Sequence, residues 1–438
     1  MPSNKNVLLV IADDLGKTLG CYGEKNIKTP NIDSFASKST IFDNAFASTA
    51  SCSGSRSVIY TGLHTHENGQ YGLTHYTHHF NTFDHIQTAL GLLREHGYRT
   101  GIISKIHVGP LSASNFFQSS KSDKRPFLLM VRYMDPHRDH TRGGFGNGDE
   151  EVSSEDALYS PENVTVPEFL SDIQNPILKY LKKHELDQDT LVIFMSDNSP
   201  SFLNSKTTLY NTSIQLPLLI HQPGVSSPES LNPNIVSYIN ILPTILDWSG
   251  YKEKEEQSTS PKLLGRSLLS ILGEPTEQDT WRQHVFSSHT FHEITNYYPT
   301  RFMRTKRYKY HRNISWKLDF PFSTDLYASL SWEGIRNAPG PVKIGERPLK
   351  AYIQRLPEEL YDLVEDPTET VNMATDPAPR DLLLELRAEL EAWHLQMKGR
   401  SLEEINGMFQ DGVPLREFGK YPRAEVEVVE ETEIVKSG

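Results

Sequence analysis

The first half of the chain contains four short apolar runs, at residues 7–11, 100–103, 127–131 and 191–195. Each run is apolar on both faces and is bounded by loop residues, which is typical of a central strand in a parallel sheet. Ligands bind such sheets beyond the carboxyl ends of the strands. The polar residues that follow the four runs are Asp13, Asp14, Lys105, His107, Asp135, His137, Asp197 and Asn198.

A single aspartate or histidine after a strand is more often a loop cap or a turn former. Coincidence is a poor explanation for four strands that all end in carboxylate, amide, lysine or imidazole groups. We therefore predict an α/β fold with a candidate site at this edge of the sheet.

The spacing of apolar residues also predicts helices and a change of architecture. Residues 88–96 fit an amphipathic crossover helix that ends at Gly97, and residues 239–248 fit a second helix. From about residue 284 the pattern changes to short, aromatic-rich strands at residues 300–305, 308–311 and 358–363. A last helix would pack an apolar stripe on that small sheet, formed by Leu383, Leu386, Leu390, Trp393 and Met397.

These patterns predict three parts. Residues 1–283 form an α/β domain with a mostly parallel central sheet flanked by helices, and residues 284–400 form a smaller α+β subdomain. Residues 401–438 are an acidic tail, either an edge strand or a disordered end.

Composition narrows the classes of function. Against 44 basic residues stand 56 acidic ones, and the net charge of −12 argues against nucleic-acid binding. An anionic substrate stays compatible with it, because the local field of a metal outweighs net charge. No apolar stretch is long enough for a membrane span. Only two cysteines and no visible export signal favour a cytoplasmic location, with a secretory route left open.

Two groups of residues suggest chemistry. Asp13, Asp14, Asp197 and Asn198 offer only oxygen atoms, which suit a hard divalent cation such as Ca²⁺. The alternative interpretation is helix capping and an Asx turn. Cys52 comes four residues before Arg56 at the start of a predicted helix, which places a potential nucleophile beside a positive charge. Taken alone, Cys52 is more simply explained as a buried free cysteine.

The segment from Cys52 to Arg56, with Thr61-Gly62 after it, resembles the signature of the sulfatase family, in which the cysteine is oxidised to formylglycine. Residues 11–16, 29–33 and 196–198 resemble other sulfatase blocks in the expected order. Within the family the chain is most similar to the heparan N-sulfatase group. That similarity is carried by residues 61–64, 67–73, 78–80, 105–110, 135–138, 145–148 and 292–293.

The resemblance implies an alkaline-phosphatase-like fold and the hydrolysis of a sulfate ester or N-sulfate, on a sugar. It implies that a formylglycine-generating or equivalent maturation enzyme converts Cys52 to an aldehyde. One hydroxyl of the hydrated aldehyde would attack sulfur, and the other would expel sulfate. The implied calcium ligands are Asp13, Asp14, Asp197, Asn198 and the modified Cys52.

Roles for the remaining residues also follow from the resemblance. Arg56 would hold the hydrate, and Lys105 and Lys206 would bind sulfate oxygens as point charges. His107 would accept a proton, and His137 would donate one to the leaving group. The candidates for sugar recognition are Asp135, Arg138, His292 and Glu293.

The chain also departs from the family pattern. Gly54 replaces the usual proline or alanine, Ser199 replaces a glycine, and Asn240 replaces an aspartate. The segment between His107 and Asp135 is short, and residues 166–183 lack a helix-length piece. Two alternatives stay open. One is a phosphatase or phosphonate hydrolase of the same fold, with the Cys52 thiol or a flanking serine, Ser51 or Ser53, as nucleophile. The other is a catalytically silent sulfatase-like binding protein.

Overall fold

A computed structural model describes residues 5–25, 28–75, 77–103, 116–118, 123, 125–133, 138–139, 144–145, 174–225, 231–252 and 261–396. Residues 1–397 form one compact unit. Four predicted site residues lie outside the described residues, namely Lys105, His107, Asp135 and His137, as does the tail of residues 401–438. The predicted domain boundaries stay predictions.

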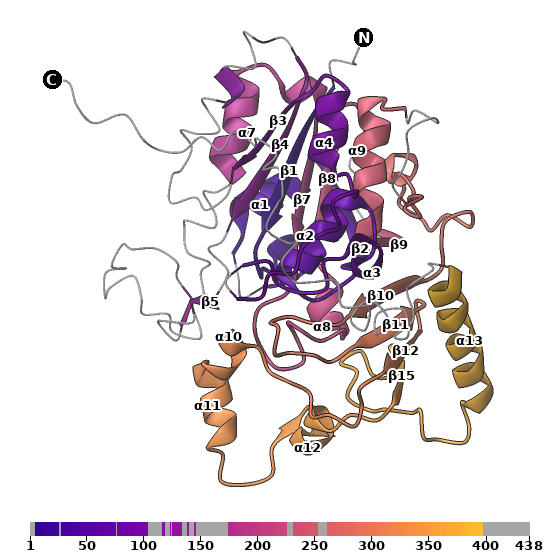
Figure 1. The fold of residues 1–438 in the computed structure, drawn as a ribbon. Coiled ribbons are helices and arrows are strands. Elements are labelled where there is room, and N and C mark those ends of the chain that lie inside the picture. Colours follow the sequence, from indigo (N-terminus) through magenta and orange to yellow (C-terminus); the bar gives the residue numbers. More distant parts are fainter. Residues whose placement is uncertain are drawn as a thin grey trace, which may run out of the picture. The chain divides into compact units, whose positions relative to one another are not determined.

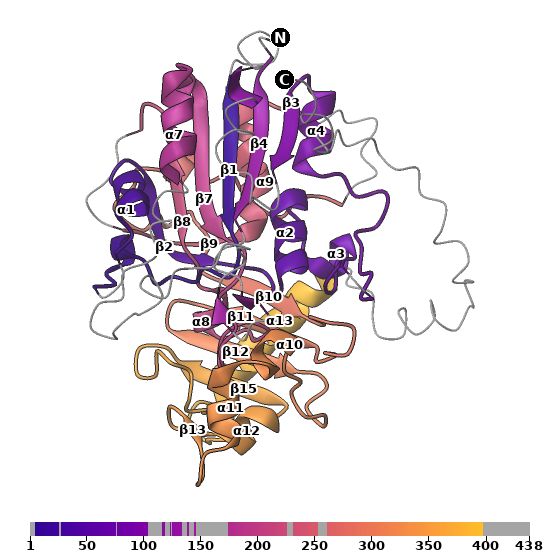
Figure 2. The same cartoon turned by 90° about the vertical axis from the view of Figure 1, so that its left-hand side faces the viewer.

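A seven-stranded sheet forms the centre of this unit, with the strand order β3-β4-β1-β7-β8-β2-β9. The four strands predicted from the apolar runs are neighbours in it and run parallel to one another (Figure 2). Strand β8 is antiparallel to both β7 and β2, while β2 and β9 are parallel. The strands are β1 (Asn6–Ala12), β2 (Thr40–Phe46), β3 (Arg99–Ile103), β4 (Phe127–Tyr133), β7 (Thr190–Ser196), β8 (Leu218–His221) and β9 (Asn232–Ser237).

Different helices cover the two faces of this sheet. Alternate residues of β1 pack on one face against α2 (Cys52–Thr61), α4 (Ala89–Glu95) and α9 (Ile241–Ser249). The others pack on the opposite face against α1 (Pro30–Ala36) and α7 (Gln174–Lys183), as Figure 1 shows. Both faces of the central strands are therefore buried, as their continuous apolar runs predict.

The ends of the predicted helices follow from local chemistry. The Thr88 hydroxyl accepts a hydrogen bond from the Gly91 amide at the start of α4, and Gly97 follows its end with a φ of 88°. Helix α7 lies within the segment that the sequence marks as shortened, and its Leu181 is buried against the sheet. The prediction of a central strand at residues 100–103 was wrong in its position, because β3 lies at the edge of the sheet with only β4 beside it. None of its residues is fully buried, and Ile102 is 44% exposed.

A second, antiparallel sheet has the order β10-β11-β12-β15, formed by β10 (Val285–His289), β11 (Thr300–Arg304), β12 (Tyr308–Asn313) and β15 (Glu358–Asp362). Helix α13 (Arg380–Gln396) packs on this sheet against Met303, Tyr310 and Leu360. The packed residues of its predicted stripe are Leu383, Leu386, Leu390 and Trp393, while Met397 lies outside the described residues. The predicted architecture of the C-terminal region is thus confirmed.

Short elements complete the described residues, and none of the described helices is long and apolar enough to cross a membrane. The short helices are α3 (Thr65–Asn68), α8 (Asn211–Ile214), α10 (Thr324–Tyr327), α11 (Leu330–Arg336) and α12 (Leu349–Ile353), with 3-10 turns η1 (Gly20–Tyr22), η2 (Asp187–Asp189), η3 (Tyr238–Asn240) and η4 (Leu269–Ile271). The two-residue strands are β5 (Arg138–Asp139), β6 (Gly144–Phe145), β13 (Lys343–Ile344) and β14 (Arg347–Pro348).

Two neutral histidines lie under helix α13. The rings of His64 and His66 stack 5.6 Å apart, and both meet the Trp393 ring edge-on. Burial lowers the pKa of His64 to about 3 and holds the pKa of His66 well below its usual value. Unfolding exposes both rings, whose pKa then returns to about 6.5. Below pH 6.5 the unfolded chain therefore binds more protons, so these residues lower the stability as the pH falls.

We expect the wild-type protein to lose more stability between pH 6.5 and 5.5 than the double variant His64→Gln/His66→Gln, by roughly 1 kcal/mol per histidine. Burial raises the pKa of Glu67 to about 7, so its protonation stabilises the folded state as the pH falls, opposite to the effect of the histidines. Comparing the wild type with the double variant removes this contribution, which both chains share. Thermal unfolding at both pH values measures the difference between the two chains. The exposed His79→Gln serves as control. Equal pH dependence in the wild type and the double variant would contradict this prediction.

Candidate active site

The candidate site lies where strands β1 and β7 end side by side. Ala12 and Ser196 are paired in the parallel ladder, so the residues after them, Asp13-Asp14 and Asp197-Asn198, meet at one edge of the sheet. All four of these side chains are fully buried. Asp197 joins the two segments, because its Oδ1 accepts hydrogen bonds from the amides of Asp14 at 3.2 Å and Asn198 at 2.8 Å.

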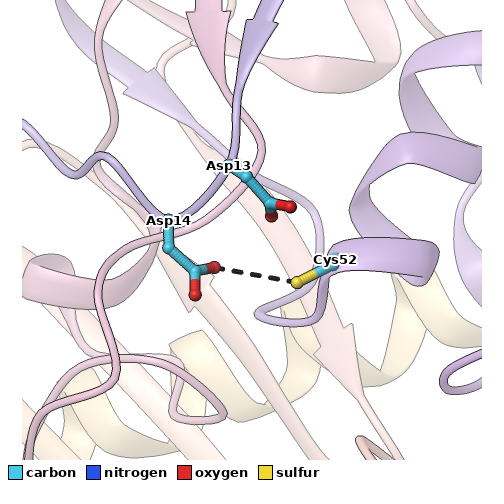
Figure 3. Close-up of side chains that lie close together, drawn as sticks. All are labelled: Asp13, Asp14 and Cys52. Carbon is cyan, nitrogen blue, oxygen red and sulfur yellow. Dashed lines mark hydrogen bonds between the residues drawn. The ribbon is translucent and has the colours of Figure 1, made fainter. Parts of the chain in front are cut away.

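Helix α2 brings Cys52 to these residues. Cys52 is the first residue of the helix and is 5% exposed. Its thiol donates to Asp14 Oδ1 at 3.7 Å and accepts a hydrogen bond from Asn198 Nδ2 at 3.1 Å. Figure 3 shows the side chains of Asp13, Asp14 and Cys52 close together, and one ligand atom from each lies within 4.8 Å of the others. The structure therefore unites the predicted nucleophile with the predicted metal ligands.

The donor set fits a hard divalent cation. Carboxylate and amide oxygens are the ligands that Ca²⁺ prefers. The Asn198 Oδ1 atom is buried and has no hydrogen-bond partner in the part of the chain that the structure describes. Since an unsatisfied buried acceptor is costly, a cation beside it would remove that cost.

Two positively charged side chains that were predicted for the site form ion pairs with the same carboxylates. Arg56 pairs with Asp13 Oδ1 at 2.7 Å and also with Asp197. Lys206 Nζ donates to Asp14 Oδ2 at 2.7 Å. Although burial acts to lower it, Asp14 and Asp325 hold the pKa of Lys206 well above its usual value. Arg56 and Lys206 therefore stay charged beside Asp13, Asp14 and Asp197.

The loop that carries Lys206 is held by the C-terminal region. Asn204 and Thr207 flank the lysine with φ values of 61° and 71°, which are strained for residues other than glycine. The Asn204 amide donates to the Tyr352 hydroxyl at 3.1 Å, and Arg347 donates to the Asn204 side chain at 3.2 Å. These contacts fix the loop conformation that buries Lys206.

The Cys52 thiol is a poor nucleophile as it stands. Burial raises the pKa of Cys52 well above its usual value, and Asp14 and Asp13 add to the rise while Lys206 opposes it. A thiol is reactive mainly as a thiolate. This environment therefore disfavours the alternative in which unmodified Cys52 attacks.

Of the residues predicted for sugar recognition, His292 lies at the start of helix α2. It is buried, and its Nδ1 is 3.0 Å from the hydroxyl of Ser51, the residue before Cys52. Glu293 instead accepts hydrogen bonds from the amide and hydroxyl of Thr324, at 3.0 and 2.8 Å. Glu293 thus holds the start of α10. Arg138 lies in the two-residue strand β5.

Sequence reasoning missed two charged residues of the site. Asp325 on α10 pairs with Lys206 at 2.9 Å, and no sequence pattern marks it. Although burial acts to raise it, Lys206 and His292 lower the pKa of Asp325 below its usual range. Arg132 on β4 donates to Asp13 Oδ2 at 2.9 Å. A charged residue within the otherwise apolar run of residues 127–133 is the signal that could have found it.

Three departures from the family pattern have local explanations. A Cβ atom at Gly54 would come within 2.9 Å of the Thr49 methyl group, so glycine fits the space that Thr49 leaves. The Ser199 hydroxyl donates to the carbonyl of Thr212 at 2.6 Å. Asn240 accepts from the Ser237 amide at 2.9 Å and donates to a backbone carbonyl at 2.7 Å. Each substituted residue is therefore accommodated in the fold.

Comparisons with known proteins agree with this geometry. The sulfatase family model matches residues 5–124 and 113–251, and the model described as N-sulphoglucosamine sulphohydrolase, C-terminal, matches residues 202–320. The chain belongs to the sulfatase family, whose members are hydrolases, and its fold is alkaline-phosphatase-like.

Individual relatives cover most of the chain. It is 34% identical to N-sulphoglucosamine sulphohydrolase of Homo sapiens over 89% of each chain. It is 25% identical to an ulvan-active sulfatase of Formosa agariphila over 91% of this chain and 81% of that protein. The crystal structure of a sulfatase from Pseudoalteromonas sp. superimposes with a TM-score of 0.63 at 17% identity, over 90% of this chain and 91% of that one.

Proposed function

We propose that this chain removes sulfate from a sugar through a formylglycine made from Cys52 and a calcium ion bound beside it, with the N-sulfate of a glucosamine as the first candidate substrate. The observation that carries the proposal is the position of the Cys52 sulfur, between Asp14 and Asn198 at the start of α2. The similarity to human N-sulphoglucosamine sulphohydrolase supports the N-sulfate over other sulfates.

The calcium ion would be held by Asp13, Asp14, Asp197 and Asn198, with the modified Cys52 beside them. A bound divalent cation supplies electrostatic stabilisation of the negative charge on a sulfate group. Positive side chains of the protein would add to this stabilisation. Arg56 pairs with Asp13 and Asp197, and Lys206 pairs with Asp14. Both side chains are buried, so their charges are little screened by water.

The burial of Cys52 limits when it can be converted to formylglycine. The residue is 5% exposed and begins a helix whose neighbours Ser51 and Ser55 are also buried. An enzyme that oxidises the thiol has to reach the extended peptide, so it would act before the fold closes. The maturation enzyme is therefore a proposed partner of the unfolded chain.

The experiment is a comparison of three substrates with chain produced in a host that makes formylglycine. N-sulfoglucosamine, glucosamine 6-sulfate and an aryl phosphate are offered at the same concentration, with calcium or with excess chelator. We expect sulfate release from N-sulfoglucosamine to be fastest and to depend on calcium. Preference for the aryl phosphate would favour a phosphatase. No hydrolysis by chain that carries the aldehyde and calcium would favour a silent binding protein.

A further inference from the structure

Arg132 occupies an unusual place in the central sheet. It is paired with Ile11 in the ladder between β4 and β1, close to the carboxyl end of both strands. Its Nη2 donates to Asp13 Oδ2 at 2.9 Å, and its charge also acts on Asp197. Arg132 therefore adds a third positive charge to the carboxylates proposed to hold calcium.

Ion pairs occupy the three carboxylates proposed to hold calcium. Asp13 has a guanidinium on each oxygen, with Arg56 at Oδ1 and Arg132 at Oδ2. Asp197 pairs with Arg56, and Asp14 pairs with Lys206. Among the described residues, three cationic side chains thus pair with these three carboxylates, and Lys206 also pairs with Asp325. A divalent cation that takes a carboxylate oxygen here has to displace or share one of these partners.

Arg132 is the partner best placed to move. Its side chain is 28% exposed, against 8% for Arg56 and 1% for Lys206. Arg56 and Lys206 each bridge two carboxylates, whereas Arg132 pairs with Asp13 only among the described residues. The Arg132 Nε atom has no hydrogen-bond partner in that part of the chain either. Displacing Arg132 therefore breaks the fewest contacts.

We propose that Arg132 competes with calcium for Asp13 and sets the affinity of the site. Without the cation, the guanidinium neutralises Asp13 and lets the site fold; when calcium binds, the side chain turns toward solvent. This inference rests on the proposed function, because it requires a cation at Asp13. It goes beyond that function by naming a residue that weakens cation binding instead of supplying a ligand.

Calcium titration of the full chain tests the inference by a readout that is independent of activity. The wild type, Arg132→Met and Arg132→Lys are stripped with chelator and titrated by calorimetry. We expect Arg132→Met to bind calcium between about 5- and 150-fold more tightly, since a like charge next to the ion is removed. Arg132→Lys keeps the charge and should stay within about threefold of the wild type.

A matched control is Arg307→Met, which removes an arginine in the turn between β11 and β12 that pairs at 2.9 Å with Asp362, at the end of β15. Its calcium affinity should equal that of the wild type. If Arg132→Met fails to fold, Arg132→Gln removes the same charge. Equal or weaker binding by the neutral variants, beside a wild type that binds calcium, overturns the role of Arg132 alone. Absence of binding by every chain overturns the calcium site itself.

Discussion

Replacing Cys52 with alanine should lower sulfate release by at least about 10⁴-fold while leaving the fold intact. Loss of a covalent nucleophile removes the chemical step, and residual catalysis then comes only from the surrounding charges. The cost in stability should be small, roughly 1 kcal/mol, because among the described residues the hydrogen bonds of the sulfur are one long contact with Asp14 and one with the side-chain amide of Asn198. Initial rates with N-sulfoglucosamine and thermal unfolding of both chains measure the two effects.

Ser51→Ala is the control for the competing nucleophile. The Ser51 hydroxyl lies 3.0 Å from His292 Nδ1, which is the contact that a serine nucleophile and its base would make. We expect Ser51→Ala to retain most of the activity. An active Cys52→Ala together with an inactive Ser51→Ala would assign the reaction to the serine and reject the formylglycine mechanism.

Replacing Lys206 with methionine should have the second largest effect, on both activity and stability. Loss of this buried positive charge from the proposed sulfate site should lower kcat/KM by about 10²–10³-fold. Asp325, which pairs with Lys206 at 2.9 Å, is then left as a buried unpaired carboxylate. Breaking such a pair costs roughly 3–5 kcal/mol of unfolding free energy. Steady-state kinetics and denaturant unfolding measure the two losses.

The double variant Lys206→Met/Asp325→Asn separates these losses. Removing the unpaired carboxylate should restore part of the stability, whereas activity should stay low because the charge at the sulfate is still missing. Lys206→Arg keeps the charge and should be the most active of the Lys206 variants. Recovery of activity in the double variant would show that Lys206 acts through stability alone.

The sequence was sufficient to predict the part of the fold whose burial is complete. Strands β1, β4 and β7 read as continuous apolar runs because their neighbours and the covering helices bury nearly all of their residues. Strand β3 lies at the edge of the sheet, and none of its residues is fully buried. Their polar endings lead to Asp13, Asp14, Asp197 and Asn198, which the structure brings to one edge.

The strands that were not predicted have weaker patterns. Strand β2 contains Asp43 and Asn44 among its apolar residues, and β8 has only four residues. Their order and the antiparallel direction of β8 depend on pairing between distant segments, which periodicity does not encode. The strand propensity of such short segments is therefore too weak to predict them, and contacts with the rest of the fold determine their structure.

The roles of the charged residues Arg132 and Asp325 also depend on contacts between distant segments. Arg132 is an interruption in an apolar strand, and its meaning depends on the neighbouring β1 placing Asp13 beside it. Asp325 reaches Lys206 across 119 residues of sequence, which no motif spans. Glu293 was predicted for sugar recognition from the resemblance of residues 292–293 to the family, and the structure adds that its carboxylate accepts hydrogen bonds from Thr324.

Mass spectrometry of the peptide that spans Cys52, from protein purified out of its native host, shows whether Cys52 is converted to formylglycine. Oxidation of the thiol to formylglycine changes the peptide mass, and a carbonyl-reactive probe identifies the aldehyde. We predict aldehyde at Cys52 in the fraction of protein that releases sulfate. A preparation that contains only the thiol and still releases sulfate from N-sulfoglucosamine at full rate would contradict the formylglycine mechanism.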